Sequence, residues 1–161
     1  MNLRPFTDAD FDELVTAWRA ASVVAHPFLT PDFLEAEVES IREIYLPAAE
    51  TWVAEDDGKL VGFLSLLGSE VGALFVHPSA WHQGIGRALL AKAVELRGDL
   101  TLRVFAENEV GRTFYRKVGF IETGREDHKE TGSELVRMEL TADGSAEERA
   151  NDASEPERKD G

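Results

Sequence analysis

The chain has 161 residues, of which 43% are hydrophobic, so it is long enough for one domain with a core and too short for two. It has no cysteine, which excludes disulfides and thiolate metal sites. It also has neither a membrane-spanning apolar run nor a signal-peptide core, so we expect a soluble cytoplasmic protein. A net charge of −14 argues against nucleic-acid binding, and it reflects either solubility or attraction of a cationic substrate such as an amine.

The N-terminal part of the chain predicts one strand and two helices. Residues 2–6 are typical of a short strand, and Thr7–Asp10 has the pattern of a capping box that opens a helix with one apolar face. A loop between the helices is expected over residues 22–30. Thr30-Pro31 is a start signal for a second helix, which we expect to end at Pro47.

The middle of the chain alternates short apolar runs with turn residues. Asp57-Gly58 is a strong hairpin signal between two such runs. The elements predicted here are strands over 51–56, 59–67 and 70–76, a helix over 86–97 and a strand over 100–105.

The C-terminal part predicts one more helix and two strands. Asn108 is a helix cap, and Gly119 is a left-handed stop after Val118. Strands are expected over 119–125 and 133–140. These elements give a mixed sheet packed between helices, an α/β (α+β) domain over residues 1–140. Residues 141–161 carry 7 acidic and 3 basic residues and almost no large apolar side chain, so we expect an acidic, disordered tail.

One strand–loop–helix segment has the features of a phosphate site. Gly84 and Gly86 leave the backbone bare where a helix begins, so several amide N–H groups and the positive end of the helix dipole can face one anion. A dinucleotide-binding motif is excluded because the bulky Leu89 occupies the third glycine position and seven residues separate Val76 from the first glycine. The Lys-Ser/Thr pair of a nucleotide P-loop is absent as well.

A second segment, Asn108-Glu-Val-Gly-Arg-Thr-Phe-Tyr-Arg-Lys-Val-Gly-Phe120, follows one strand later. Taken singly, its residues are typical of a cap, core aromatics and a helix stop. Together the two segments resemble the GCN5-related N-acetyltransferase (GNAT) superfamily, with its motifs Arg/Gln-x-x-Gly-x-Gly/Ala and Asn-x-x-Ala-x-x-Phe-Tyr-x-x-x-Gly-Phe. The resemblance covers roughly residues 2–140. The chain is further similar to the YjaB-like branch in Ala25-His-Pro-Phe-Leu29, Leu46-Pro-Ala-Ala, Trp52-Val-Ala and Ala73-Leu-Phe-Val.

The resemblance implies a mixed, mostly antiparallel seven-stranded sheet with helices on both faces, and acetyl-coenzyme A as cosubstrate. It places the pyrophosphate on backbone amides at the helix start and the pantetheine arm along the preceding strand. The implied cofactor-binding residues are Phe75, Val76, Gln83, Gly84, Ile85, Gly86, Arg87, Ala88, Asn108 and Phe114. Trp81 stands where the family has Arg or Gln, and Gly111 replaces the usual alanine, which weakens the helix slightly.

The resemblance also suggests catalytic roles. Tyr115 is the candidate general acid for the leaving thiolate, and the alternative is a buried structural phenol. A backbone N–H near Phe75 or Val76 is the candidate oxyanion donor. Glu70 matches the glutamate base of the histone-acetylating members, or it is a solvated acid at a strand end. His26, in the loop on the acceptor side, contacts the substrate or is structural.

We therefore expect direct transfer of acetyl from acetyl-CoA to a primary amine, either a protein lysine or a small cationic amine. Four dispersed histidines have no zinc-ligand spacing, and we expect no metal. We expect neither nucleic-acid nor membrane partners, and both a monomer and a homodimer stay open. The alternative function is a non-catalytic acyl-CoA-binding sensor or interaction module. The acceptor site is expected from residues 22–30 and 126–132.

Overall fold

A computed structural model describes residues 1–142, so the predicted tail falls almost entirely outside the described residues. The strands are β1 (Asn2–Pro5), β2 (Glu50–Asp56), β3 (Lys59–Leu67), β4 (Glu70–Val76), β5 (Leu100–Phe105), β6 (Ile121–Asp127) and β7 (Glu134–Leu140). The helices are α1 (Phe11–Ala25), α2 (Pro31–Ser40), α3 (Leu46–Ala48), α4 (Ile85–Arg97) and α5 (Glu109–Val118), with a π-helical turn at Ile41–Tyr45 and 3-10 turns at Asp8–Asp10 and Pro78–Ala80. None of the helices within residues 1–142 is long and apolar enough to cross a membrane.

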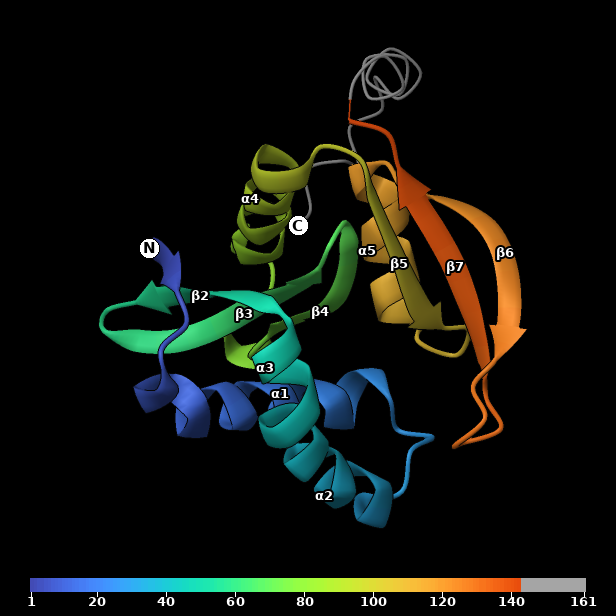
Figure 1. The fold of residues 1–161 in the computed structure, drawn as a ribbon, viewed down its shortest axis with the longest axis horizontal. Coiled ribbons are helices and arrows are strands. Elements are labelled where there is room, and N and C mark those ends of the chain that lie inside the picture. Colours follow the sequence, from blue (N-terminus) through green and yellow to red (C-terminus); the bar gives the residue numbers. More distant parts are fainter. Residues whose placement is uncertain (143–161) are drawn as a thin grey trace.

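The strands form one seven-stranded sheet in the order β1-β2-β3-β4-β5-β7-β6 (Figure 1). All neighbours are antiparallel except β4 and β5, which run parallel. These two strands pair only at Glu70 with Thr101 and at Val71 with Leu102, and beyond that point they diverge. The predicted mixed, mostly antiparallel sheet is confirmed, and it carries a gap at its centre.

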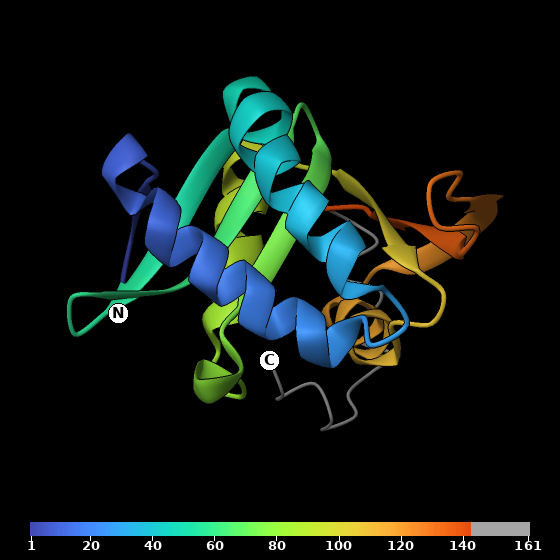
Figure 2. The same cartoon turned by 90° about the horizontal axis from the view of Figure 1, so that it is seen from below.

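Helices cover both faces of the sheet, as predicted (Figures 1 and 2). On one face, α1 and α2 bury a cluster that includes Leu14, Trp18 and Phe63. On the other face, α4 and α5 bury a larger cluster around Leu89 and Phe120. Because successive residues of a strand point to opposite faces, β4 contributes to both clusters.

The element boundaries differ from the prediction at several places. The second helix, expected to end at Pro47, is α2 followed by the π-helical turn and α3, and β6 continues to Asp127 beyond the expected end at residue 125. Two further differences have a clear local cause. Helix α1 continues to Ala25 into the expected loop, because Ser22 is buried and its carbonyl oxygen accepts the His26 N–H at 2.8 Å, which closes a last helical turn. Strand β6 begins at Ile121, since Gly119 has a φ of +116° and the Phe120 N–H donates to the Tyr115 carbonyl at 2.9 Å. The C-terminal helix stop thus occupies the residues where the strand was expected to begin.

Candidate active site

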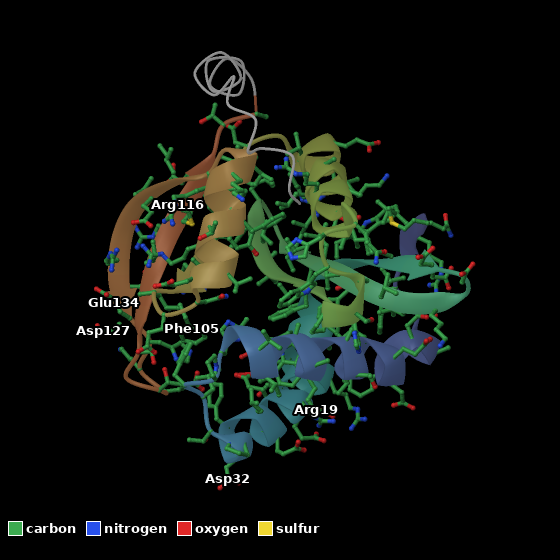
Figure 3. The ribbon with its side chains drawn as sticks, turned by 180° about the vertical axis from the view of Figure 1, so that it is seen from behind. Arg19, Asp32, Phe105, Arg116, Asp127 and Glu134 are labelled. Carbon is green, nitrogen blue, oxygen red and sulfur yellow. The ribbon has the colours of Figure 1, made fainter. Side chains whose placement is uncertain are left out.

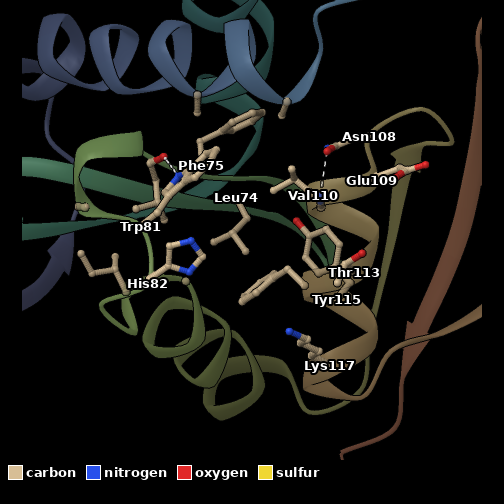
Figure 4. Close-up of a pocket in the computed structure, with 18 residues that line it drawn as sticks. Leu74, Phe75, Trp81, His82, Asn108, Glu109, Val110, Thr113, Tyr115 and Lys117 are labelled. Atoms are coloured by element: carbon tan, nitrogen blue, oxygen red, sulfur yellow. Dashed lines mark hydrogen bonds between the residues drawn. The ribbon is translucent and has the colours of Figure 1, made fainter. Parts of the chain in front are cut away.

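A cavity of about 470 Å³ opens between β4, α4 and α5, with the C-terminal part of α1 at its border (Figure 4). Its lining is mostly apolar. Six of the predicted cofactor-binding residues line it: Phe75, Val76, Ile85, Gly86, Asn108 and Phe114. The remaining four, Gln83, Gly84, Arg87 and Ala88, lie at the start of α4 outside the cavity lining. We call this the first cavity.

The start of α4 has the bare backbone and open amide groups that the glycines predict. Gly84 is the N-cap with a φ of +82°, a conformation that side chains disfavour. The first helical hydrogen bond runs from the Ala88 N–H to the Gly84 carbonyl at 3.0 Å, so the Ile85 and Gly86 amides at the helix start have no acceptor in a preceding turn of the helix. A Cβ on Gly86 would lie 3.0 Å from Cζ of Phe114, so the bare residue lets α4 and α5 approach closely. This end of the cavity suits an anion.

Strand β4 presents backbone groups to the central gap. The His77 N–H donates to the Val61 carbonyl at 2.8 Å, and hydrogen-bonded pairs alternate along an antiparallel ladder. The backbone groups of Phe75 therefore face β3, whereas those of Leu74 and Val76 face the gap. Of the two predicted oxyanion donors, only the Val76 N–H points where a ligand in the gap would reach it; the other predicted donor, Phe75, is turned away by the ladder.

Trp81 has a role that the sequence did not indicate. Its Nε1 donates to the Val76 carbonyl oxygen at 2.6 Å, so the indole ties the loop before α4 to the end of β4. Trp81, which stands where the family has Arg or Gln, therefore occupies the Val76 carbonyl oxygen, one of the β4 acceptors that face the gap. The Val76 N–H and the Leu74 backbone are the groups left facing the gap.

Tyr115 extends from α5 into the first cavity toward β4 (Figure 4). Its side chain is buried, with Phe114 and Phe120 each at a ring-centroid distance of 5.4 Å in edge-on contact. Burial raises the pKa of the Tyr115 phenol well above its usual value of 10. The phenol therefore stays protonated at neutral pH and can donate a proton or a hydrogen bond.

Asn108 caps α5 and also reaches across the molecule. Its Oδ1 accepts the Gly111 N–H at 2.9 Å, and its Nδ2 lies 3.1 Å from Nε2 of His26. Both Asn108 and His26 are buried. Asn108 thus borders the first cavity while its side-chain atoms are engaged within the protein.

A second cavity of about 500 Å³ lies under α1, α2 and the turn between β6 and β7. It receives His26 and Leu29 from the predicted loop and His128 and Glu130 from the predicted turn, so both expected acceptor segments line one space. Phe105 lies at the end of β5 (Figure 3). Its ring makes edge-on contacts with the rings of His26 and His128, each at a ring-centroid distance of 5.2 Å. Phe75 lines both cavities.

The charges around the second cavity are mainly acidic. Glu37, Glu70 and Glu130 line it together with Arg103. Burial, followed by the charge of Glu130, raises the pKa of Glu37 above its usual value. An added positive charge here would relieve that repulsion, so the cavity favours a cationic ligand.

The structure places Glu70 in the second cavity and away from the first. Its Oε2 accepts a hydrogen bond from Nε of Arg103 at 3.0 Å, so the side chain has a partner and is not merely solvated. Six residues of strand span about 20 Å between Glu70 and Val76. Glu70 is therefore too far from Val76 for direct contact with a group bound there.

Sequence reasoning missed several residues of the first cavity. Outside α5 they are Ala21 and Ala25 on α1, Leu74 on β4, and Ala80, Trp81 and His82 before α4. The others lie on α5. These α5 residues are Glu109, Val110, Thr113 and Lys117. Val110, Phe114 and Lys117 recur at helical spacing on the face that lines the cavity, and this periodicity is the signal that could have identified them.

Comparisons with known proteins agree with this geometry. The model of the Acetyltransferase (GNAT) domain matches residues 47–122. The peptidyl-lysine N-acetyltransferase YjaB of Salmonella typhimurium is 35% identical over 141 residues, which cover 87% of this chain and 97% of that protein. Its counterpart in Escherichia coli is 33% identical, with 87% and 95% covered.

Solved structures show the same fold. The apo-form of YjaB from Escherichia coli, solved in solution, superposes with a TM-score of 0.78 at 32% identity and covers 86% of this chain and 96% of that one. The PaiA N-acetyltransferase of Thermoplasma acidophilum, determined in complex with coenzyme A, superposes with a TM-score of 0.69 at 24% identity, with 87% and 98% covered.

Proposed function

Because the chain belongs to the GNAT family of N-acetyltransferases, we propose that acetyl-CoA binds in the first cavity and that a primary amine reaches its thioester from the second. The observation that carries this proposal is the divergence of β4 and β5 after Val71 and Leu102. The divergence opens the sheet between two cavities that share Phe75. Cosubstrate and acceptor can therefore meet at the gap.

The residues of the first cavity fit coenzyme A. The amides at the start of α4 suit its pyrophosphate, and Gly86 provides a surface without a side chain. The Val76 N–H and the Leu74 backbone suit the amide groups of an extended pantetheine arm, since at that point β4 pairs with β3 on one side and has no paired strand on the side of β5. This support comes from backbone groups, so it tolerates the substitution at Trp81.

Three groups of the chain then act on the transfer. The Val76 N–H donates to the thioester oxygen, where negative charge grows as the C–N bond forms. Tyr115 donates a proton to the sulfur as the C–S bond breaks. Glu70, through water, accepts the proton that the amine loses. Glu70 is thus the proposed base, and water carries the proton to it because Glu70 does not reach the reacting amine directly.

The acceptor that fits the second cavity is a lysine side chain of a protein or peptide. Its aliphatic stem suits the aromatic walls, and Glu37 and Glu130 attract its ammonium group into the cavity before the nitrogen reaches the gap. The similar proteins of Salmonella typhimurium and Escherichia coli are named peptidyl-lysine N-acetyltransferases, which supports the same acceptor here. We place the enzyme in the cytoplasm, where acetyl-CoA is available.

A panel of amines tests this function. The purified protein is incubated with acetyl-CoA and, separately, with an N-terminally blocked lysine peptide, a free diamine and an aromatic amine, and thiol release is measured against product mass. We expect the blocked lysine peptide to be acetylated and to be the best acceptor. Thiol release equal to the background hydrolysis with every amine would contradict the proposal, and preference for the free diamine would move the acceptor to small cations.

A further inference from the structure

One buried hydrogen bond crosses the wall between the two cavities. It joins Nε2 of His26, at the end of α1, to Nδ2 of Asn108, at the start of α5, across 3.1 Å. Asn108 lines the first cavity and His26 lines the second. His26 is only 8% exposed, as is Asn108. A contact in this position belongs to both halves of the site.

The partners of Asn108 fix the direction of this hydrogen bond. Its Oδ1 is engaged by the Gly111 N–H, so the amide presents its NH₂ group to the imidazole. Nε2 of His26 must therefore be the bare acceptor nitrogen, and Nδ1 carries the proton. If the imidazole were protonated, its Nε2–H would face the Nδ2–H of Asn108, and two donors cannot form a hydrogen bond. The geometry selects one neutral tautomer.

The surroundings of His26 also favour the neutral ring. Phe28, Phe75 and Phe105 pack around it edge-on, with ring-centroid distances of 5.7, 6.3 and 5.2 Å. None of these groups, nor the Asn108 amide, is charged. Burial lowers the pKa of His26 from 6.5 to about 4. A neutral ring does not repel a cationic amine in the second cavity.

Gly111 provides the space that this arrangement requires. A Cβ built on Gly111 would lie 2.6 Å from Nδ2 of Asn108 and 3.1 Å from its Cγ. The amide cannot move aside without losing its hydrogen bonds to His26 and to the Gly111 N–H. The family motif has alanine at this position, which forms helices better than glycine. Glycine in place of the family's alanine therefore leaves the space in which the Asn108 amide can hydrogen-bond to His26.

From these contacts we infer that His26 is a positioning residue for acetyl transfer, acting through Asn108, and that Gly111 is the residue that permits the pair. The inference rests on the proposed function. The pair fixes α5, which carries Tyr115, relative to the loop that borders the acceptor cavity. Attack requires the amine and the thioester carbon to be held at about 3 to 3.5 Å with aligned orbitals, so a shift of this wall lowers the rate.

Three variants separate positioning from folding. His26→Leu removes the acceptor, His26→Gln supplies a carbonyl oxygen to the Asn108 NH₂ group, and Gly111→Ala displaces Asn108 while keeping both partners. Each is studied with acetyl-CoA binding by calorimetry, kcat and KM with a lysine peptide, and thermal unfolding. Long-range ¹H–¹⁵N spectra of the imidazole report its tautomer without any substrate.

We expect kcat of His26→Leu to fall about 10-fold to 100-fold while its Kd for acetyl-CoA stays within about threefold of wild type. His26→Gln should recover most of the loss. Gly111→Ala should fall like His26→Leu although alanine favours the helix, and its imidazole spectrum should change from the Nδ1-protonated form of the wild type.

Two results would overturn the inference: His26→Gln no more active than His26→Leu, or Gly111→Ala with the wild-type kcat. A role in folding alone would lower the melting temperature and the active fraction but leave kcat per folded molecule unchanged. Failure of the proposed function looks different, because the wild type itself would then neither bind acetyl-CoA nor acetylate the peptide. That result would overturn both.

Discussion

The buried histidine makes the stability of this protein depend on pH in a defined window. His26 has a pKa of about 4 in the folded protein, against 6.5 for an unperturbed imidazole. Between these values the unfolded chain binds a proton that the folded protein does not. The free energy of unfolding must therefore fall as the pH falls from 6.5 toward 4, and above pH 6.5 this contribution is fully present.

The size of the effect follows from the difference in pKa. The contribution lost is about 2 kcal/mol by pH 5 and about 3 kcal/mol by pH 4. Carboxylates titrate over part of the same range, and Asp10, whose pKa is lowered to about 2 mainly by its hydrogen bond to Arg4, does so below it. These groups are common to the wild type and to His26→Gln, so they cancel when the two proteins are compared.

Urea denaturation of both proteins at pH 7 and at pH 5 measures the difference. Relative to His26→Gln, we expect the wild type to lose about 2 kcal/mol more between the two pH values. Parallel losses in the two proteins would mean that His26 titrates normally in the folded state. They would also remove the argument that a neutral imidazole borders the acceptor cavity.

Three further variants test separate parts of the site. Gly86→Val should lower the affinity for acetyl-CoA, measured by calorimetry, about tenfold or more, because the Cβ would lie 3.0 Å from Phe114 and the branched side chain would cover the amides at the start of α4. Unchanged affinity would contradict the placement of the pyrophosphate. Glu70→Gln should lower kcat/KM for the lysine peptide about 10-fold to 100-fold with a change in its pH profile, whereas a wild-type profile would leave Glu70 as the ion-pair partner of Arg103 alone. Trp81→Phe removes the hydrogen bond to the Val76 carbonyl and should raise KM for acetyl-CoA a few-fold with little change in kcat; an equal loss in kcat would show that the loop positions the reacting groups as well.

Much of this fold is encoded locally. Apolar periodicity, the hairpin glycine after Asp57 and the helix stop at Gly119 gave the element order, and Gly84 and Gly86 gave the start of α4. Tyr115 was identified from a motif within one helix. These signals need only neighbouring residues, so a single sequence carries them.

The relations between distant segments were not predictable in this way. His26 and Asn108 are 82 residues apart, and Glu70 and Arg103 are 33 apart, so their contacts depend on how the sheet and its helices assemble. The direction of the Val76 and Phe75 backbone depends on strand register, which the sequence leaves open. Local patterns therefore predict which segments border the two cavities, whereas the contacts between those segments depend on the folded structure.

The kcat of Tyr115→Phe, measured beside its Kd for acetyl-CoA, tests the central claim most directly. The phenol is buried in the first cavity, and its raised pKa keeps it protonated, as the proposed acid for the leaving thiolate must be. We expect the variant to bind acetyl-CoA as the wild type does while acetylating a lysine peptide about 100-fold more slowly or worse. A variant that acetylates the peptide at the wild-type rate would contradict this account of the site.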